Sequence, residues 1–240
     1  MNLIKVKDYA EMSQKAAEFI IDKVRSTPGL KLGLATGGTP VGTYQKLIED
    51  HQNNKTSYHD VVTFNLDEYI GLSGENKNSY RFFMNNKLFN HIDIEKSNTF
   101  IPRGDVEDII SECRKYEELI SKHGGVDLQI LGIGGNGHIG FNEPGTSFDT
   151  KTHVVNLADS TIEANARFFN SMEEVPTQAI TMGISSIMKS KEILLLISGE
   201  GKREAMKQLL HGGISEEFPA SVLNTHPAVT IIADQAALAD

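Results

Sequence analysis

The sequence has few of the features that mark secreted, membrane or nucleic-acid-binding proteins. It contains one cysteine, Cys113, in 240 residues, so it can form no internal disulfide and has no second thiolate for a sulfur-ligated metal site. Its longest apolar runs, such as residues 193–197, are far shorter than the roughly 20 residues of a membrane-spanning helix. The N-terminus does not resemble a signal peptide. We therefore expect a cytoplasmic protein that does not enter a membrane.

Basic residues are also scarce. The chain has 23 Lys and Arg against 32 Asp and Glu, which gives a formal charge of −9 with His neutral. Nucleic acids are bound by clustered Lys and Arg side chains, and no such cluster occurs, so we expect no nucleic-acid partner. Any anionic ligand must be bound by a local group of donors that opposes the overall charge.

Length and composition indicate a globular protein with a sizeable core. Hydrophobic residues make up 39% and charged residues 23% of the chain, and its 21 Gly and 7 Pro are close to average usage. These values exclude disordered, collagenous and low-complexity classes. Because the chain has no internal repeat and no linker-like stretch, we predict that residues 1–240 form a single α/β domain.

Strand-like and helix-like segments alternate along the chain. Apolar residues recur with helical spacing, or form short buried runs typical of strands, in a regular order. The pattern predicts helices at 9–24, 43–50, 80–89, 105–123, 160–169 and 201–210, and strands at 30–35, 61–66, 128–133, 193–198 and 229–233. Such alternation is typical of βαβ units. It predicts an α/β fold with an open, mostly parallel sheet that has helices on both faces.

A glycine turn at residues 36–40 follows the first predicted strand and precedes a helix. Free backbone N–H groups at such a helix N-terminus can bind phosphate. The Gly-Lys-Ser/Thr that completes a nucleotide-binding P-loop does not follow, so we expect no nucleoside triphosphate. An ordinary strand-to-helix turn remains the alternative for this motif alone.

A second glycine-rich stretch, residues 132–137, has the G-x-G-x-x-G spacing of dinucleotide-binding sites. That function requires a helix to begin at the motif, but residues 138–145 are interrupted by Gly and Pro. We therefore predict a polar loop. The loop brings together His138 and Glu143, a pair suited to proton transfer near neutral pH, although an isolated His is more often structural.

Adjacent carboxylates, Asp67 and Glu68, follow another predicted strand. Side chains of neighbouring residues in an extended segment diverge, so we expect at most one of them to face a site, and Asp67 comes first after the apolar run. A partly desolvated carboxylate at a strand end can have a raised pKa and act as a general base. A solvated loop acid is the alternative.

Two cations are also candidates for binding an anion. Lys202 comes at the start of a predicted helix after a buried strand, where its charge is unfavourable unless an anion is present. Arg167 lies among apolar residues, and its planar guanidinium suits phosphate recognition. Taken singly, each such residue is more often a surface salt-bridge partner.

In combination, these motifs resemble the glucosamine-6-phosphate deaminase family, also called glucosamine-6-phosphate isomerase. The resemblance rests on residues 36–40, 65–69, 134–144, Arg167 and Lys202, in that order over most of the chain, and LDEY together with GNGHIGFNEP is its most specific part. It implies a Rossmann-like fold and conversion of glucosamine 6-phosphate and water into fructose 6-phosphate and ammonia. It implies a small sugar phosphate as the binding partner and no metal or organic cofactor.

The resemblance also implies a role for each candidate residue. Asp67 would remove the proton from C2 and return it at C1 through an enolamine intermediate. His138 would assist opening of the pyranose ring, and Glu143 would set the position and basicity of His138. The substrate phosphate would be bound by residues from three strand ends, namely Gly37, Gly38, Thr39, Arg167 and Lys202.

The sequence departs from the family pattern at the catalytic loop. Many members have Asp two residues before the catalytic His, whereas this chain has Asn136. The Asn carbonyl can accept a hydrogen bond from the imidazole but has no charge to stabilise imidazolium. The chain also ends soon after Asp234, whereas longer members have a further C-terminal segment associated with hexamers and allosteric control. We therefore expect a monomer or a small homo-oligomer.

Two other functions fit part of the pattern. A 6-phosphogluconolactonase shares the fold and a similar Gly-rich His motif, but it hydrolyses an ester and needs no base for a carbon acid. The carboxylate of LDEY and the NEP after the His motif favour the deaminase. A sugar-phosphate-sensing regulator would bind without turnover, and the presence of Asp67, His138 and Glu143 together makes an enzyme the better hypothesis.

Overall fold

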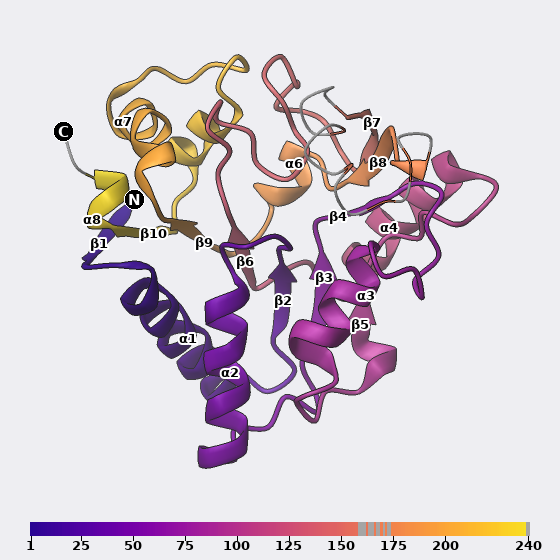
Figure 1. Ribbon diagram of the computed structural model, residues 1–240, viewed down its shortest axis with the longest axis horizontal. Helices are drawn as coiled ribbons and strands as arrows, with labels where there is room; N and C mark the ends of the chain where they lie inside the picture. Colours follow the sequence, from indigo (N-terminus) through magenta and orange to yellow (C-terminus); the bar gives the residue numbers. More distant parts are fainter. Residues whose placement is uncertain (158–161, 163–165, 167–168, 170, 172–173, 239–240) are drawn as a thin grey trace.

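A seven-stranded sheet forms the centre of the computed structural model, which describes residues 1–157, 162, 166, 169, 171 and 174–238 (Figure 1). All neighbouring strands run parallel. Their order across the sheet is β1 (Asn2–Val6), β10 (Val229–Asp234), β9 (Glu192–Ile197), β6 (Leu128–Leu131), β2 (Lys31–Leu34), β3 (Val62–Asn65) and β5 (Thr99–Phe100). The prediction of an open, parallel, Rossmann-like sheet is therefore confirmed.

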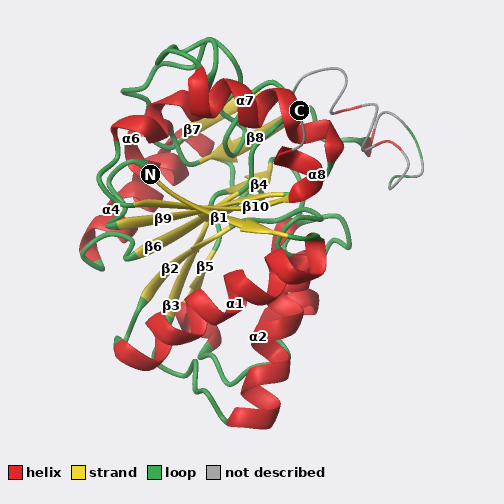
Figure 2. Ribbon diagram, turned by 90° about the vertical axis from the view of Figure 1, so that its left-hand side faces the viewer, coloured by secondary structure: helices red, strands yellow, loops and turns green. Residues whose placement is uncertain are grey.

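Helices cover both faces of this sheet, as Figure 2 shows in a view along its edge. One face packs against α1 (Tyr9–Ser26), α2 (Val41–Asn54), α3 (Tyr80–Met84) and the π-helix Asn85–Phe89. The other packs against α4 (Ile109–Lys122), α6 (Ile184–Ile187), α7 (Arg203–His211) and α8 (Gln235–Leu238). Among the described helices, none has the length and apolar character needed to cross a membrane.

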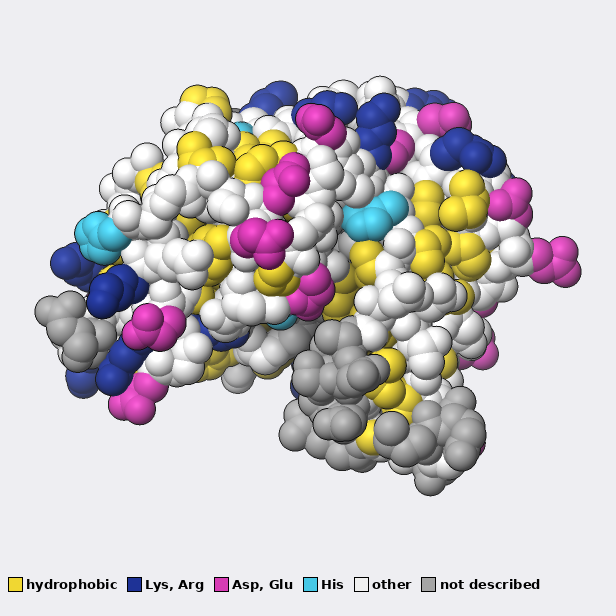
Figure 3. All heavy atoms as spheres, turned by 90° about the horizontal axis from the view of Figure 1, so that it is seen from above, with side chains coloured by type: hydrophobic (Ala, Val, Ile, Leu, Met, Phe, Trp, Pro, Cys, Tyr) yellow, Lys and Arg dark blue, Asp and Glu magenta, His cyan; other side chains and the backbone are white. Residues whose placement is uncertain are grey.

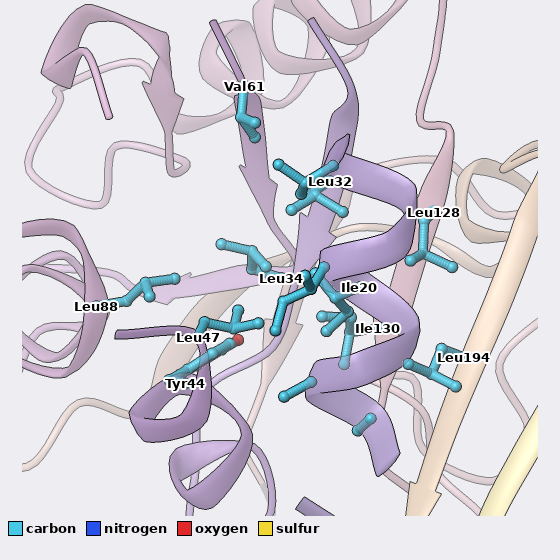
Figure 4. Packing of buried hydrophobic residues seen from close by; sticks show 14 of the residues in the cluster. Ile20, Leu32, Leu34, Tyr44, Leu47, Val61, Leu88, Leu128, Ile130 and Leu194 are labelled. Atoms are coloured by element: carbon cyan, nitrogen blue, oxygen red, sulfur yellow. The ribbon is translucent and has the colours of Figure 1, made fainter. Parts of the chain in front are cut away.

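The period of two along each strand explains why both faces are buried. In β9, Leu194 and Leu196 join the cluster under α1 and α2, whereas Leu195 joins the cluster on the opposite face. Figure 4 shows the first cluster, in which Ile20 of α1 and Leu47 of α2 lie over the sheet. A strand buried on both faces reads as a continuous apolar run, and the sequence of β9 is such a run.

A second, smaller sheet was not predicted. It contains β4 (Asp67–Tyr69), β8 (Gln178–Thr181) and β7 (His153–Asn156), all antiparallel. Its first strand begins two residues after β3 ends, and the N–H of Met182 donates to the carbonyl of Leu66 at 2.7 Å between them. This second sheet lies beyond the C-terminal ends of β2 and β3 (Figure 1), and it therefore holds residue 67 above the central sheet.

Several predicted boundaries change in the structure. The predicted helix 80–89 is α3 followed by one π-helical turn, closed by a bond from the Asn90 N–H to the Asn85 carbonyl. The predicted helix 201–210 begins at Arg203 and is preceded by the 3-10 helix Glu200–Lys202. The predicted helix 160–169 lies largely outside the described residues. Two further 3-10 helices, Lys96–Asn98 and Pro219–Thr225, and the edge strand β1 were not predicted.

Candidate active site

The main candidate cavity lies where the strand order changes direction. From β2 the chain proceeds to β3 and β5 on one side, while β6 and the later strands lie on the other. In open parallel sheets such a switch point leaves a crevice at the carboxyl ends of the strands. The structure has a cavity of about 210 Å³ there, lined by residues 35–40 after β2, Leu66 and Asp67 after β3, residues 130–134 around the end of β6, and Tyr80, His138, Gly140, Phe141 and Leu196.

The glycine turn forms one wall of this cavity. Gly37, Gly38 and Thr39 all line it, and Gly37 has a φ of +91°, which favours glycine. A Cβ built at Gly37 or Gly38 would meet no atom within 4 Å, so the turn is open on its outer side. Helix α2 begins directly afterwards with no side-chain cap at Pro40. Backbone N–H groups of this turn can therefore serve an anionic ligand.

Asp67 lies on the cavity wall and is 6% exposed. Burial, and then the charge of Glu68, raises the pKa of Asp67 from 3.8 to about 8. Among the described residues, none donates a hydrogen bond to its carboxylate that would offset this burial. A Cβ built at Gly140 would lie 3.7 Å from Asp67 Oδ2, so the backbone of the His138 loop passes close to the carboxylate. A carboxylate with a pKa in this range has the property that a general base near neutral pH requires.

Glu68 has a different environment although it is adjacent. Its carboxylate accepts hydrogen bonds of 2.9 Å from the backbone N–H groups of Tyr69, Tyr80 and Arg81. These bonds hold the first turn of α3 against β4. Burial raises the pKa of Glu68, while the three backbone donors oppose the rise. Because side chains alternate along the strand, the Asp67 carboxylate faces the cavity and the Glu68 carboxylate faces the start of α3.

Tyr80 and Phe141 line the cavity, and sequence reasoning missed both. The Tyr80 hydroxyl lies 3.1 Å from that of Tyr69. Burial, and then the charge of Asp67, raises the pKa of Tyr80 well above its usual value. Phe141 lies within the His138 motif but has no titratable group, so it did not stand out as a candidate. Tyr80 belongs to no such motif, and its backbone N–H donates to Glu68 at the start of α3.

The His138 loop has a tight turn in place of the helix that a dinucleotide site requires. The N–H of Gly134 donates to the carbonyl of His138 at 2.9 Å, and Gly137 has a φ of +86°. A Cβ at Gly134 would lie 2.3 Å from the imidazole, so only glycine leaves room for the ring. No helix begins in the described segment 132–152. The expectation of a polar loop agrees with this geometry.

His138, Glu143 and Asn136 contact one another in this loop. The imidazole Nδ1 lies 3.2 Å from Glu143 Oε1. The Asn136 amide donates to Glu143 Oε2 at 2.6 Å, and its carbonyl oxygen accepts from the backbone N–H of His138 at 3.2 Å. The Asn136 carbonyl oxygen, which could accept a hydrogen bond from the imidazole, accepts instead from the backbone of His138. The nearby imidazole of His138 lowers the pKa of Glu143, burial opposes that effect, and the Asn136 amide adds to it.

Lys202 lies beside this loop and is not among the residues that line the cavity. A Cβ at Gly135 would lie 3.8 Å from the carbonyl oxygen of Gly201, so the two loops are neighbours. Lys202 is half-buried, and burial lowers its pKa. In the described part of the chain, no acidic group lies within ion-pair distance of it. Arg167, the other predicted phosphate ligand, lies outside the described residues.

Asp234 supports the turn before Lys202, a role that the sequence did not reveal. Its buried carboxylate, at the end of β10, accepts hydrogen bonds from the Ser198 hydroxyl and from the N–H of Gly199. Gly199 has a φ of +94°, so the turn depends on glycine. In the sequence, an acidic residue at the end of the last strand cannot be distinguished from a solvent-exposed one. Its function depends on a partner 35 residues earlier in the chain.

One face of the molecule shows no large patch of a single charge among its described residues (Figure 3). On the face shown in Figure 3, Lys and Arg side chains are interspersed with Asp and Glu. Within the described residues, no group of three or more His, Cys, Asp or Glu side chains could hold a metal ion. Asp67 and His138 both line the cavity and are residue types that can transfer protons.

Comparisons with known proteins identify close relatives. Residues 7–232 match the family described as glucosamine-6-phosphate isomerases/6-phosphogluconolactonase. A glucosamine-6-phosphate deaminase from Halalkalibacterium halodurans is 59% identical over 238 residues, which cover 99% of this chain and 97% of that protein. Glucosamine-6-phosphate deaminase 1 from Bacillus subtilis is 53% identical, and the alignment covers 99% of this chain and 98% of that protein.

Solved structures give the same result. A structure described as a monomeric glucosamine-6-phosphate deaminase superposes with a TM-score of 0.95 at 53% identity, covering 99% of this chain and 98% of that one. The 6-phosphogluconolactonase from Trypanosoma brucei superposes with a TM-score of 0.79 at 16% identity, covering 98% and 97% of the two chains. At that identity the second likeness shows a shared fold alone.

Proposed function

The chain belongs to the glucosamine-6-phosphate isomerase/6-phosphogluconolactonase family, and from this membership and the geometry of the cavity we propose that it is a glucosamine-6-phosphate deaminase. The enzyme converts glucosamine 6-phosphate and water into fructose 6-phosphate and ammonia, a step in the breakdown of amino sugars. The proposal is supported by close relatives of that name that match almost the whole chain.

The observation that carries the proposal is the buried carboxylate of Asp67 in the cavity. Moving the carbonyl group from C1 to C2 requires a base that removes the C2 proton and an acid that returns a proton at C1. A carboxylate whose pKa is about 8 can do both near neutral pH, because its two protonation states are then of similar free energy. Hydrolysis of a lactone requires no such base, so this feature favours the deaminase over the lactonase.

His138 supplies the proton transfer that opens the sugar ring. Glu143 contacts Nδ1, which leaves Nε2 to exchange a proton with the ring oxygen and O1. Because contacts with His138 and Asn136 lower the pKa of Glu143, this group stays ionised and stabilises the imidazolium that forms during the transfer. Asn136 acts by fixing the second carboxylate oxygen of Glu143.

The phosphate binds at the wall formed by Gly37, Gly38 and Thr39, with Lys202 and Arg167 supplying positive charge. Backbone N–H groups at the start of α2 provide hydrogen-bond donors, and the first turn of this helix contains no acidic residue that would repel the phosphate. Burial disfavours the charged form of the half-buried Lys202 ammonium. A phosphate dianion beside it would offset this cost. Local donors thus explain how a chain with a formal charge of −9 can bind a phosphate.

The remaining expectations follow from the same chemistry. Proton transfers by Asp67 and His138 are sufficient for isomerisation and for hydrolysis of the resulting imine, so we propose no metal or organic cofactor. We expect a monomer, since the solved relative with 53% identity is described as monomeric, and a location in the cytoplasm.

The proposal is tested by incubating the purified protein with glucosamine 6-phosphate, without added metal or nucleotide, and measuring ammonia and fructose 6-phosphate. We expect equal release of both products. Asp67→Asn should lose turnover by about 100-fold or more, the range that a general base contributes. Asp60→Asn is the matched control, because Asp60 lies before β3 and its side chain is 79% exposed. Hydrolysis of 6-phosphogluconolactone without release of ammonia would show that the fold is right and the chemistry wrong.

A further inference from the structure

Tyr9, the first residue of α1, contacts the proposed phosphate-binding turn from outside the cavity. Its hydroxyl donates to the carbonyl of Gly38 at 2.9 Å and accepts from the N–H of Gly42 at 2.8 Å. Gly38 belongs to the turn, and Gly42 belongs to the first turn of α2. One phenol oxygen therefore joins the turn to the helix that follows it.

This contact depends on a close approach of two helices. Helices α1 and α2 pack side by side on one face of the sheet (Figure 2). A Cβ at Gly42 would lie 2.3 Å from Ser13 Oγ and 3.0 Å from Tyr9 Cε1, so glycine is needed for α2 to begin this near to α1. The Ser13 hydroxyl donates to the Tyr9 carbonyl at 2.8 Å and fixes the first turn of α1.

The peptide group between Gly38 and Thr39 connects the Tyr9 hydrogen bond to the cavity. The carbonyl of Gly38 and the N–H of Thr39 belong to the same peptide group, and in a trans peptide they point in opposite directions. The Gly38 carbonyl points to Tyr9, so the Thr39 N–H points away from α1, and Thr39 lines the cavity. A second bond to the Gly38 carbonyl, from the N–H of Val41, is 3.4 Å long and constrains it less.

We propose that Tyr9 is a positioning residue that orients the Gly38–Thr39 peptide so that its N–H faces the phosphate of the substrate. The inference rests on the proposed function, because it assigns the phosphate to this turn. Tyr9 touches neither the cavity nor the reacting carbons, so it acts on substrate affinity and leaves the proton transfers at Asp67 and His138 unchanged.

The test is Tyr9→Phe, which removes one hydroxyl and keeps the ring. We expect KM for glucosamine 6-phosphate to rise about threefold to tenfold, the range that the loss of a hydrogen bond produces. The inhibition constant of inorganic phosphate should rise by the same factor, and kcat should change by less than about twofold because uniform binding is lost. Tyr58→Phe is the matched control, because the buried Tyr58 hydroxyl has no hydrogen-bond partner in the described part of the chain.

A second variant separates positioning from a general loss of structure. Gly42→Ala places a methyl group against Ser13 and Tyr9 and should disrupt the same contact, so adding Tyr9→Phe to it should change KM by less than about twofold. Unchanged KM and unchanged phosphate inhibition in Tyr9→Phe would overturn the inference, as would a loss of kcat at constant KM.

The failure of this inference can be told apart from the failure of the proposed function. Wild-type protein that does not turn over glucosamine 6-phosphate would refute the deaminase proposal. Calorimetric titration of wild type and Tyr9→Phe with inorganic phosphate would still decide the role of Tyr9. Weaker phosphate binding in the variant supports the role, and equal binding refutes it.

Discussion

Replacing Asp67 by Asn should stabilise the folded protein at neutral pH while it abolishes turnover. Asp67 is 6% exposed, and its carboxylate receives no hydrogen bond from a described residue. Its charge is therefore costly in the folded state. Asn has nearly the same volume and no charge, so the substitution removes the cost and keeps the packing.

The magnitude follows from the shift in pKa. Burial raises the pKa of Asp67 from 3.8 to about 8, so between these values the folded state holds a proton that the unfolded chain has released. Stability from this group is fully present below the lower value and is lost as pH rises through the higher one. Between these two values the free energy of unfolding falls by about 1.4 kcal/mol per pH unit. At pH 7 it is therefore lower by at most about 4 kcal/mol than it would be with an uncharged side chain at this position.

Thermal unfolding of wild type, Asp67→Asn and the control Asp60→Asn measures this effect. A change of 1 kcal/mol shifts the melting temperature of a chain of this size by about 2–4 °C, so we expect Asp67→Asn to melt up to about 8–16 °C higher at pH 7. The gain should be smaller at about pH 5 and larger at about pH 8. A gain that does not change with pH, or a variant less stable than wild type at about pH 8, would refute the reasoning.

Three further predictions concern the same site. In the proposed mechanism Asp67 must be ionised to remove the C2 proton, so kcat/KM should fall about tenfold for each pH unit below about 8, which initial rates at low substrate concentration will show. Lys202→Ala should raise KM and the inhibition constant of inorganic phosphate about tenfold or more with little change in kcat, and equal values would remove Lys202 from the phosphate site. Asn136→Asp replaces an amide donor 2.6 Å from Glu143 with a second carboxylate, so the pKa of Glu143 should rise in a carboxyl NMR titration; no rise would show that this contact does not tune Glu143.

The five inner strands of the central sheet could be predicted because they are buried on both faces, whereas the edge strands β1 and β5 were not predicted. The segments at 128–133 and 193–198 are short apolar runs between helical segments, and β6 and β9 lie within one or two residues of those bounds. The second sheet could not be predicted. Its strand β4 has three residues, too few for a period of two to be recognised, and its partner β8 lies more than 100 residues later.

The candidate site was predictable where a motif concentrates unusual residue types. The glycine turn, Asp67 and the pair His138 and Glu143 each stand at a strand end in the sequence, and the structure places them around or beside one cavity. The supporting residues were not predictable, because their roles come from tertiary contacts. Tyr9 and Asp234 act through hydrogen bonds to backbone groups 29 and 35 residues away, and no local pattern encodes such a partner.

The two adjacent carboxylates show how the fold assigns different chemistry to similar residues. Both are buried, and burial raises the pKa of both. Glu68 accepts three backbone hydrogen bonds, which oppose the rise in its pKa. Asp67 receives none from a described residue and faces the cavity, so nothing offsets the effect of burial, which favours the protonated form of its carboxyl group. The role of base that we propose for Asp67 therefore depends on a difference in hydrogen bonding: the fold supplies backbone donors to Glu68, and no described residue donates to Asp67.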